Sequence, residues 1–151
     1  MAKFRYRMQN ILDIKSKMEL QAKNEYAFAN GVLQDEKEKL RALLGRRAYY
    51  EDKLREHLQN EKLDFQDVKD AKIAIRSLDE QLRRQMERVK EAEKVLEQKR
   101  LVMMEFMRER KTQEILREKA FQEFIEDEKR EESKQIDELT SYVYGVKNAT
   151  E

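Results

Sequence analysis

Apolar residues recur every seven positions along most of this chain, and that period constrains its fold more than any other feature. From Ala22 to Leu54 two such series interleave with the alternating three- and four-residue spacing of a coiled-coil seam. The first series consists of Tyr26, Leu33, Leu40, Arg47 and Leu54, and the second of Ala22, Ala29, Glu36, Leu43 and Tyr50. Arg47 and Glu36 are the polar exceptions. A second seam consists of Ile75, Leu82, Val89, Leu96 and Met103, and of Leu78, Gln85, Ala92, Lys99 and Phe106. The pattern predicts two long α-helices that pack through narrow apolar stripes.

The composition favours long helices over a globular core. Of the 151 residues, 43% are charged and 39% are hydrophobic, which leaves too few apolar side chains for a broad core. The alternatives are a disordered chain and a long helix that buries a single stripe. The chain has no proline, which costs about 3 kcal/mol in a helix interior, and only three glycines. The helical alternative therefore fits better.

The heptad pattern lapses between Gln59 and Asp70, where we expect the chain to reverse direction. Asp64 or Asp67 can cap the second helix, because a short side-chain acceptor satisfies the first free amide groups. The predicted segments are a first helix at about residues 3–60, a turn at about 61–67, a second helix at about 68–144 and a frayed tail at 145–151. The predicted fold is all-α, a single antiparallel coiled-coil hairpin over residues 1–151 whose second helix overhangs at its C-terminal end.

A hairpin that reverses near Asp64 makes the numbers of facing residues add to about 128 or 129. The predicted pairs are Leu54 with Ile75, Tyr50 with Leu78, Leu40 with Val89, Leu33 with Leu96, Tyr26 with Met103, Met8 with Ala120 and Phe4 with Phe124. One turn therefore brings both seams into phase over the whole length of the first helix.

The predicted seam is irregular. Before Ala22 it runs through Phe4, Met8, Ile11, Lys15 and Met18, and joining the two phases inserts a four-residue stutter, which locally unwinds a supercoil. Polar residues at seam positions are Lys15, Glu36, Arg47, Gln85, Lys99 and Arg110. Such residues can fix the register or face a partner where the helices splay apart, and both interpretations stay open.

The second helix continues beyond Phe124, where no first-helix residue remains to pair with it. Apolar residues return there on one face, at Ile136, Leu139, Val143 and Val146. This stripe is either a partner-binding surface or part of a frayed tail.

The sequence offers no catalytic, cofactor-binding or metal-binding group. There is no cysteine, the one histidine is His57, and no glycine-rich loop follows a strand. Basic and acidic residues number 33 and 32 and alternate closely, which argues against nucleic acid as a partner. No apolar run approaches the roughly 20 residues that span a bilayer, and no signal-peptide core follows Met1. We therefore expect a cytoplasmic location without direct membrane insertion.

Both ends of the chain carry motifs of a known family. Residues 4–15, FRYRMQNILDIK, resemble the start of the flagellar export protein FliJ family, which has an aromatic and a basic residue, an apolar-Gln pair and a Leu-Asp-apolar step. Residues 132–138, ESKQIDE, are similar to the family's Glu-Gln-Lys-x-x-Asp-Glu signature, with Ser133 in place of the usual Gln. The length and the two-helix organisation extend the resemblance over essentially the whole chain.

The resemblance implies a stalk-like component of the flagellar type III export apparatus, peripheral at the cytoplasmic face of the membrane. The paired ends of such a protein enter the ring of the hexameric export ATPase and promote its assembly and activity. Other surfaces contact the membrane-embedded export gate and the export chaperones. Carried over to this chain, the ATPase-binding residues are Arg5, Arg7, Gln9, Asp13, Glu132, Ile136, Asp137 and Glu138. The expected gate-binding residues are Leu43, Tyr50 and Leu78.

Three alternatives remain at the level of sequence. The seam can equally pair two copies of the chain, although we expect a monomer. The equivalent stalk of a virulence secretion system or of a rotary ATPase has the same architecture. An RNA- or membrane-binding helix is disfavoured by the charge balance.

Overall fold

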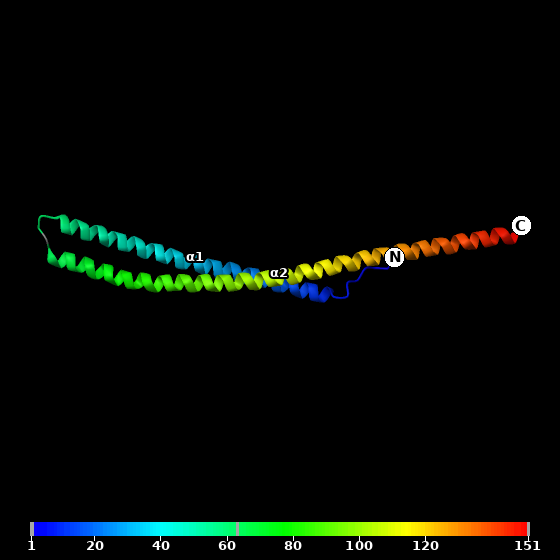
Figure 1. Cartoon of the computed structure of the whole chain (residues 1–151), viewed down its shortest axis with the longest axis horizontal. Coiled ribbons are helices and arrows are strands. Elements are labelled where there is room, and N and C mark those ends of the chain that lie inside the picture. Colours follow the sequence, from blue (N-terminus) through cyan, green and yellow to red (C-terminus); the bar gives the residue numbers. More distant parts are fainter. Residues whose placement is uncertain (1, 63, 151) are drawn as a thin grey trace. The chain divides into compact units, whose positions relative to one another are not determined.

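The computed structural model describes residues 2–62 and 64–150 and contains two α-helices. Helix α1 spans Gln9–Gln59 and helix α2 spans Phe65–Thr150. The two run antiparallel and are joined by a short turn (Figure 1), and the described ranges contain no strand. The predicted all-α antiparallel hairpin is thus confirmed.

The turn is shorter than the sequence suggested. Asp64 caps α2, because its carboxylate accepts a hydrogen bond from the backbone amide of Gln66 at 3.0 Å and its carbonyl accepts one from Val68 at 3.2 Å. This cap starts α2 at Phe65, three residues before the expected position. Leu63 was also placed in the turn and lies outside the described residues.

Residues 2–8 are not helical, whereas the sequence predicted a helix from about residue 3. Phe4 packs instead against the rings of Phe121 and Phe124, with centroids 5.1 and 5.5 Å away. The hydroxyl of Tyr6 donates a hydrogen bond to Gln113 at 2.9 Å. Phe4 and Tyr6 thus both contact α2 from the non-helical segment. The predicted contact of Phe4 with Phe124 is confirmed.

The C-terminal end also differs from the prediction. Helix α2 passes through Gly145 and continues to Thr150, where a frayed tail was expected. A glycine ends a helix when it adopts a left-handed conformation, and no described glycine has a positive φ. Gly145 is therefore an ordinary helical residue. Glu151, the last residue of the expected tail, lies outside the described part of the chain.

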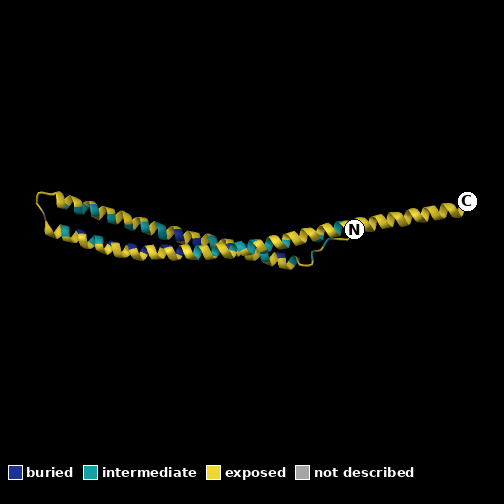
Figure 2. Cartoon of the chain, viewed as in Figure 1, coloured by how far each residue is buried: buried dark blue, intermediate teal, exposed yellow. Residues whose placement is uncertain are grey.

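The hairpin divides into two compact units, so the single predicted domain has an internal boundary. One unit comprises the chain up to Glu19 together with the chain from Glu105 onward, and the other runs from Leu20 to Met104. The core of the second unit is a cluster of Leu33, Val89 and Ala92, against which Leu40 and Leu96 pack. Buried positions lie along the inner faces of both helices, and the outer faces are exposed (Figure 2).

The predicted seam of α2 agrees with the observed burial. Its buried residues are Ala71, Leu78, Leu82, Gln85, Val89 and Ala92. In α1 the predicted positions Ala22, Ala29 and Leu33 are buried as well.

The predicted stutter at the start of α1 is wrong. Leu12, Lys15 and Glu19 face α2 there and continue the heptads of Ala22 without interruption, whereas Met18 is 40% exposed. Ile11 and Met8 are exposed too. The carboxylate of Glu19 is tolerated in the seam because Arg110 of α2 forms an ion pair with it. A pattern of apolar residues alone does not predict such a pair.

The register also differs from the predicted pairing. The side-chain amide of Gln85 donates a hydrogen bond to the backbone carbonyl of Glu36 at 2.9 Å, whereas the prediction set Glu36 opposite residues 92–93. Helix α1 ends at Gln59 and α2 begins at Phe65, so the chain reverses before Asp64, and each α1 residue faces an α2 residue closer to the turn than predicted. Among the described residues no helix is both long and apolar enough to cross a bilayer.

Candidate partner-binding surfaces

The N-terminal residues of the predicted ATPase contact lie on one short stretch of chain. Arg5 and Arg7 are exposed in the segment before α1. Gln9 opens α1, and its side-chain amide donates a hydrogen bond to Asp13 at 3.0 Å. The carbonyl oxygen of the same amide accepts one from Arg117 of α2, also at 3.0 Å. The structure thus joins Gln9, Asp13 and Arg117 in one polar cluster.

Arg117 was missed at the sequence level. Its guanidinium also lies 5.8 Å from the centroid of the Phe4 ring, within the range of a cation–π contact. It therefore links the N-terminal segment to the first turn of α1. No heptad argument identifies it, because its role depends on a segment that is not helical.

The C-terminal residues of the predicted ATPase contact lie on α2 beyond the last contacts with the N-terminal segment. Glu132, Ile136, Asp137 and Glu138 are all exposed. Of these, Glu132 comes nearest to the N-terminal segment, since it shares a hollow of about 270 Å³ with Ala2 and Phe124. The other three have no described contact with the N-terminal segment. The structure thus brings the two sets onto one unit without joining them into a single cluster.

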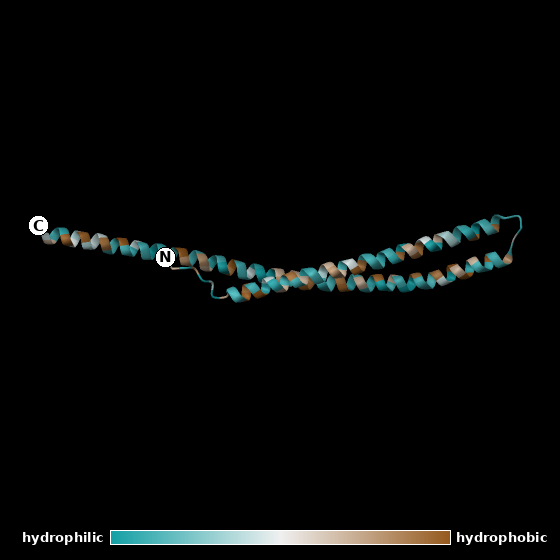
Figure 3. Ribbon diagram, turned by 180° about the vertical axis from the view of Figure 1, so that it is seen from behind, coloured by the Kyte–Doolittle hydropathy of each residue, from teal (hydrophilic) through white to brown (hydrophobic). Residues whose placement is uncertain are grey.

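The end of α2 presents an apolar stripe that the described chain does not cover. Ile136, Leu139, Val143 and Tyr144 line a shallow hollow of about 280 Å³. All four are more than half exposed, and Figure 3 shows apolar positions returning toward the end of this helix. Hydrophobic side chains that recur on one face of an otherwise polar helix are typical of a partner contact.

A polar cluster in the same unit fixes the two helices against each other. Glu19 is buried and pairs with Arg110, which also donates to Glu114 at 2.8 Å. The Glu19 carboxylate raises the pKa of Arg110 above its ordinary value, and Glu114 adds to the shift. Lys15 and Glu109 form a further ion pair at 2.7 Å. Each of these charges has an oppositely charged side chain beside it, so the seam accommodates charge at this point.

The predicted gate-binding residues, which the sequence placed in the middle of the hairpin, lie in the part of both helices nearer the turn. Tyr50 and Leu78 line a hollow of about 510 Å³ together with Gly45, Tyr49 and Ala74. The rings of Tyr49 and Tyr50 meet edge to face at 5.4 Å. Leu43 lines a smaller neighbouring hollow with Arg84 and Arg88. Leu78 is only 6% exposed, so it forms the floor of the site, and Tyr50 is the accessible member.

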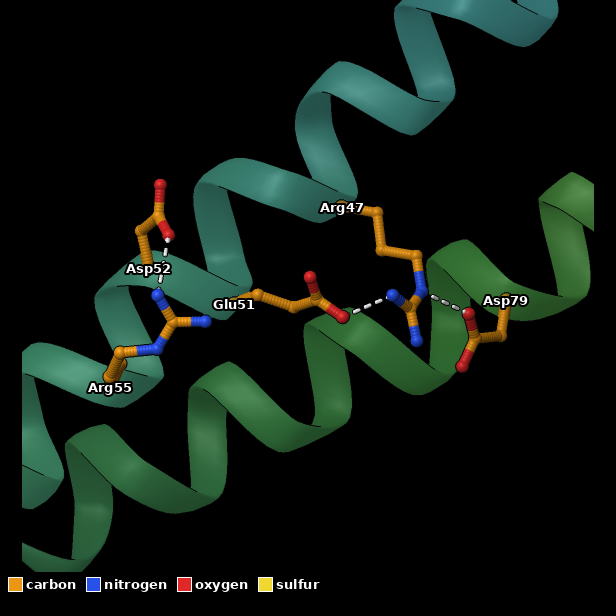
Figure 4. A network of polar contacts seen from close by, with 5 residues as sticks. All are labelled: Arg47, Glu51, Asp52, Arg55 and Asp79. Carbon is orange, nitrogen blue, oxygen red and sulfur yellow. Dashed lines mark hydrogen bonds and ion pairs between the residues drawn. The ribbon is translucent and has the colours of Figure 1, made fainter.

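An ion-pair network stands beside this hollow (Figure 4). Arg47 donates to Asp79 across the helix pair at 2.6 Å and also pairs with Glu51 on its own helix. The Asp79 contact is the main reason that the pKa of Arg47 is raised above its ordinary value. Asp52 and Arg55 form a separate pair at 3.6 Å. Arg47 therefore contacts the opposite helix, which favours the register-fixing interpretation of the two left open for it.

A further hollow was not foreseen. Phe28 and Val32 of α1 and Val95 of α2 line a groove of about 880 Å³ whose floor contains Ala29 and Ala92. Phe28 is 76% exposed. A signal was present in the sequence, because Phe28 is a large apolar residue outside the seam positions Tyr26 and Ala29.

Few of the described side chains are suited to catalysis or to metal binding. His57 lies 4.0 Å from Asp67 near the turn and contacts no nucleophile. The part of the chain that the structure describes contains no group of three or more side chains placed to hold a metal ion. The arrangement offers long, partly apolar surfaces, which can bind other proteins.

Comparisons with known proteins agree with this architecture. A family model described as flagellar FliJ protein matches residues 4–149. No curated protein matches the chain. A solved structure from Chlamydia trachomatis, described as a candidate YscO homologue, aligns with a TM-score of 0.79 over 99% of this chain and 100% of that chain. The sequence identity is 20%, so this likeness concerns the fold.

Proposed function

The chain belongs to the flagellar FliJ family, and from this premise we propose that it is a non-catalytic stalk component of the type III export apparatus. Its two ends would bind the ring of the export ATPase and promote its assembly and activity. The middle of the hairpin would contact the export gate, and export chaperones would bind elsewhere on the same chain.

The observation that carries the proposal is the uncovered end of α2. Its apolar stripe, with Ile136 and Leu139, is exposed, although the same helix buries its inner face farther back. Asp137 and Glu138 flank the stripe, and the exposed cations Arg5 and Arg7 belong to the same unit. A surface with an apolar centre and charged margins is the usual composition of a protein–protein contact.

The proposed mechanism is a difference in binding energy between states of the ring. A bound stalk changes ATPase activity only if it binds one arrangement of the subunits more tightly than another. A single chain that enters a ring of identical subunits meets them unequally, because it has no matching rotational symmetry. The charged margins add a contribution that weakens as salt is added.

The gate contact rests on the hollow beside Tyr50. Its accessible aromatic rings, Tyr49 and Tyr50, stand over a floor formed by Leu78 and Ala74. Aromatic side chains dominate the binding energy of many protein interfaces. Tyr50→Ala should therefore weaken gate binding and leave binding of the ATPase unchanged.

The test of the ATPase contact is a charge reversal with a matched control. Asp137→Lys with Glu138→Lys should weaken binding of the purified export ATPase about tenfold or more, a typical effect for central interface residues. Glu87→Lys with Glu93→Lys changes the net charge equally on an exposed part of the same helix and should bind normally. The affinity of each double variant for the ATPase is measured by biolayer interferometry at two salt concentrations and compared with that of the parent chain. Equal binding by both variants would refute the C-terminal contact.

A further inference from the structure

The groove beside Phe28 is distinct from the surface at the chain ends and from the hollow beside Tyr50. It runs from Gln21 to Glu36 on α1 and from Arg88 to Lys99 on α2, entirely inside the unit Leu20–Met104. It therefore shares no residue with the chain ends. The gate-facing hollow is lined by a different set of side chains, which includes Tyr50 and Leu78.

Two features suit this groove to a third helix. Alanines at its floor, Ala29 and Ala92, are buried and short, so another backbone can come close to the helix pair. The lining residues of each wall recur at intervals of three and four, the spacing that receives the side chains of a helix as knobs into holes. An extended strand would instead leave backbone amides facing an apolar floor without acceptors.

The length of the groove sets the length of its occupant. The α1 wall from Gln21 to Glu36 covers 15 helical steps, or about 22 Å at 1.5 Å per residue. A helix of about four turns fills this distance. Phe28, which is mostly exposed, would be covered by such a helix.

The charges along the walls define the occupant further. At one end Glu25 pairs with Lys99 at 3.1 Å, and at the other Glu36 contacts Gln85 and also lies 3.7 Å from Lys39. Among the described residues, the lining charges left without an ion pair are Arg88 and Glu91. They lie about one turn apart on the α2 wall. A matching helix would present an acidic and a basic side chain at the same interval.

We propose that this groove docks an amphipathic α-helix of a partner protein, about four turns long, with an apolar stripe flanked by one acidic and one basic residue. The stripe covers Phe28, Val32 and Val95, and the two charges pair with Arg88 and Glu91. The proposal does not depend on the ATPase or gate contacts, because none of the residues predicted for those contacts lines this groove, although Arg88 also lines the hollow beside Leu43.

The test uses two stapled, fluorescein-labelled 15-residue peptides of identical composition. Both carry leucines on one face, and they differ only in whether the glutamate precedes or follows the lysine by four positions. Fluorescence anisotropy with the full-length chain should show at least a tenfold preference for one order. The double variant Arg88→Glu with Glu91→Arg should invert that preference.

Apolar specificity is tested in the same assay. Phe28→Glu should weaken the preferred peptide at least tenfold, whereas Leu101→Glu should not, because Leu101 is 55% exposed and lies outside the groove. Both variants should keep the helical circular dichroism and melting temperature of the parent, since neither position is buried. The proposal is overturned if both peptide orders bind equally, if Phe28→Glu binds normally, or if sedimentation shows that a second copy of the chain occupies the groove.

Discussion

At the scale of single residues, the buried carboxylate of Glu19 shows why a charged side chain can occupy a coiled-coil seam. Its side chain is 4% exposed and lies against Arg110. Arg110 has a second carboxylate partner in Glu114, which is largely accessible to solvent. The pair is therefore asymmetric in burial, because Glu19 is almost fully buried, whereas Arg110 is 22% exposed and also reaches the accessible Glu114.

This asymmetry predicts opposite results from two similar substitutions. Arg110→Leu should lower the melting temperature by about 5 °C or more, because it removes the cross-seam counterion of a buried carboxylate. Glu19→Leu should leave the melting temperature unchanged or raise it, since an aliphatic residue suits a seam position. Thermal unfolding followed by circular dichroism measures both. A larger loss for Glu19→Leu than for Arg110→Leu would contradict this explanation.

A second residue-scale prediction concerns pH. The hydrogen bonds from Arg100 lower the pKa of Glu97 below its ordinary value. A carboxyl group whose pKa is lower in the folded state stabilises that state above its unfolded pKa, and this contribution disappears as the pH falls through the folded pKa. Glu97→Gln should therefore melt slightly below the parent at neutral pH. The two melting curves should converge under acidic conditions, and a constant difference down to acidic pH would exclude this pair as the cause.

At the scale of helices, the heptad positions of α2 and most of those of α1 could be predicted from the sequence, because buried apolar side chains at seam spacing set them. Two features could not be predicted in this way. The start of α1 follows a non-helical segment from which Phe4 and Tyr6 contact α2. The continuous seam through Glu19 depends on a counterion more than 90 positions away in the chain.

The glycines give a prediction at this scale. Gly31 and Gly45 lie inside α1, and an added Cβ at either would meet no atom within 4 Å beyond its chain neighbours and the adjacent turns of its own helix backbone. Alanine reduces the entropy of the unfolded chain, so Gly31→Ala and Gly45→Ala should each stabilise the protein by about 0.5–1 kcal/mol. Chemical denaturation measures the free energy of unfolding.

The two positions differ in function. Gly45 lines the hollow beside Tyr50, whereas Gly31 lines none of the hollows described above. Gly45→Ala is therefore the variant in which a change of gate binding can accompany the gain in stability, and Gly31→Ala is its control. Destabilisation by either alanine would mean that the glycine has a conformational role that the helical backbone does not show.

At the scale of the whole chain, the resemblance of both end motifs to one family was sufficient to predict the family that the comparison then matched. The candidate surfaces were less predictable. The exposed stripe after Phe124 follows from the imbalance in helix length, but the groove beside Phe28 requires knowledge of which faces of α1 and α2 meet. Side-chain periodicity identifies the seam and does not show how deep the hollows beside it are.

Removing the overhang of α2 allows its contribution to stability and its contribution to ATPase binding to be measured separately. Residues 131–150 are all exposed, so a chain that ends after Arg130 loses no buried side chain. Its melting temperature should stay within about 2 °C of the parent value, because exposed positions contribute little to stability. Binding to the export ATPase should nevertheless fall at least tenfold, since the apolar stripe and its acidic neighbours are gone. A truncated chain that melts much earlier would show that the overhang supports the hairpin, and full ATPase binding by a stable truncated chain would assign that contact to the N-terminal segment with Arg5 and Arg7.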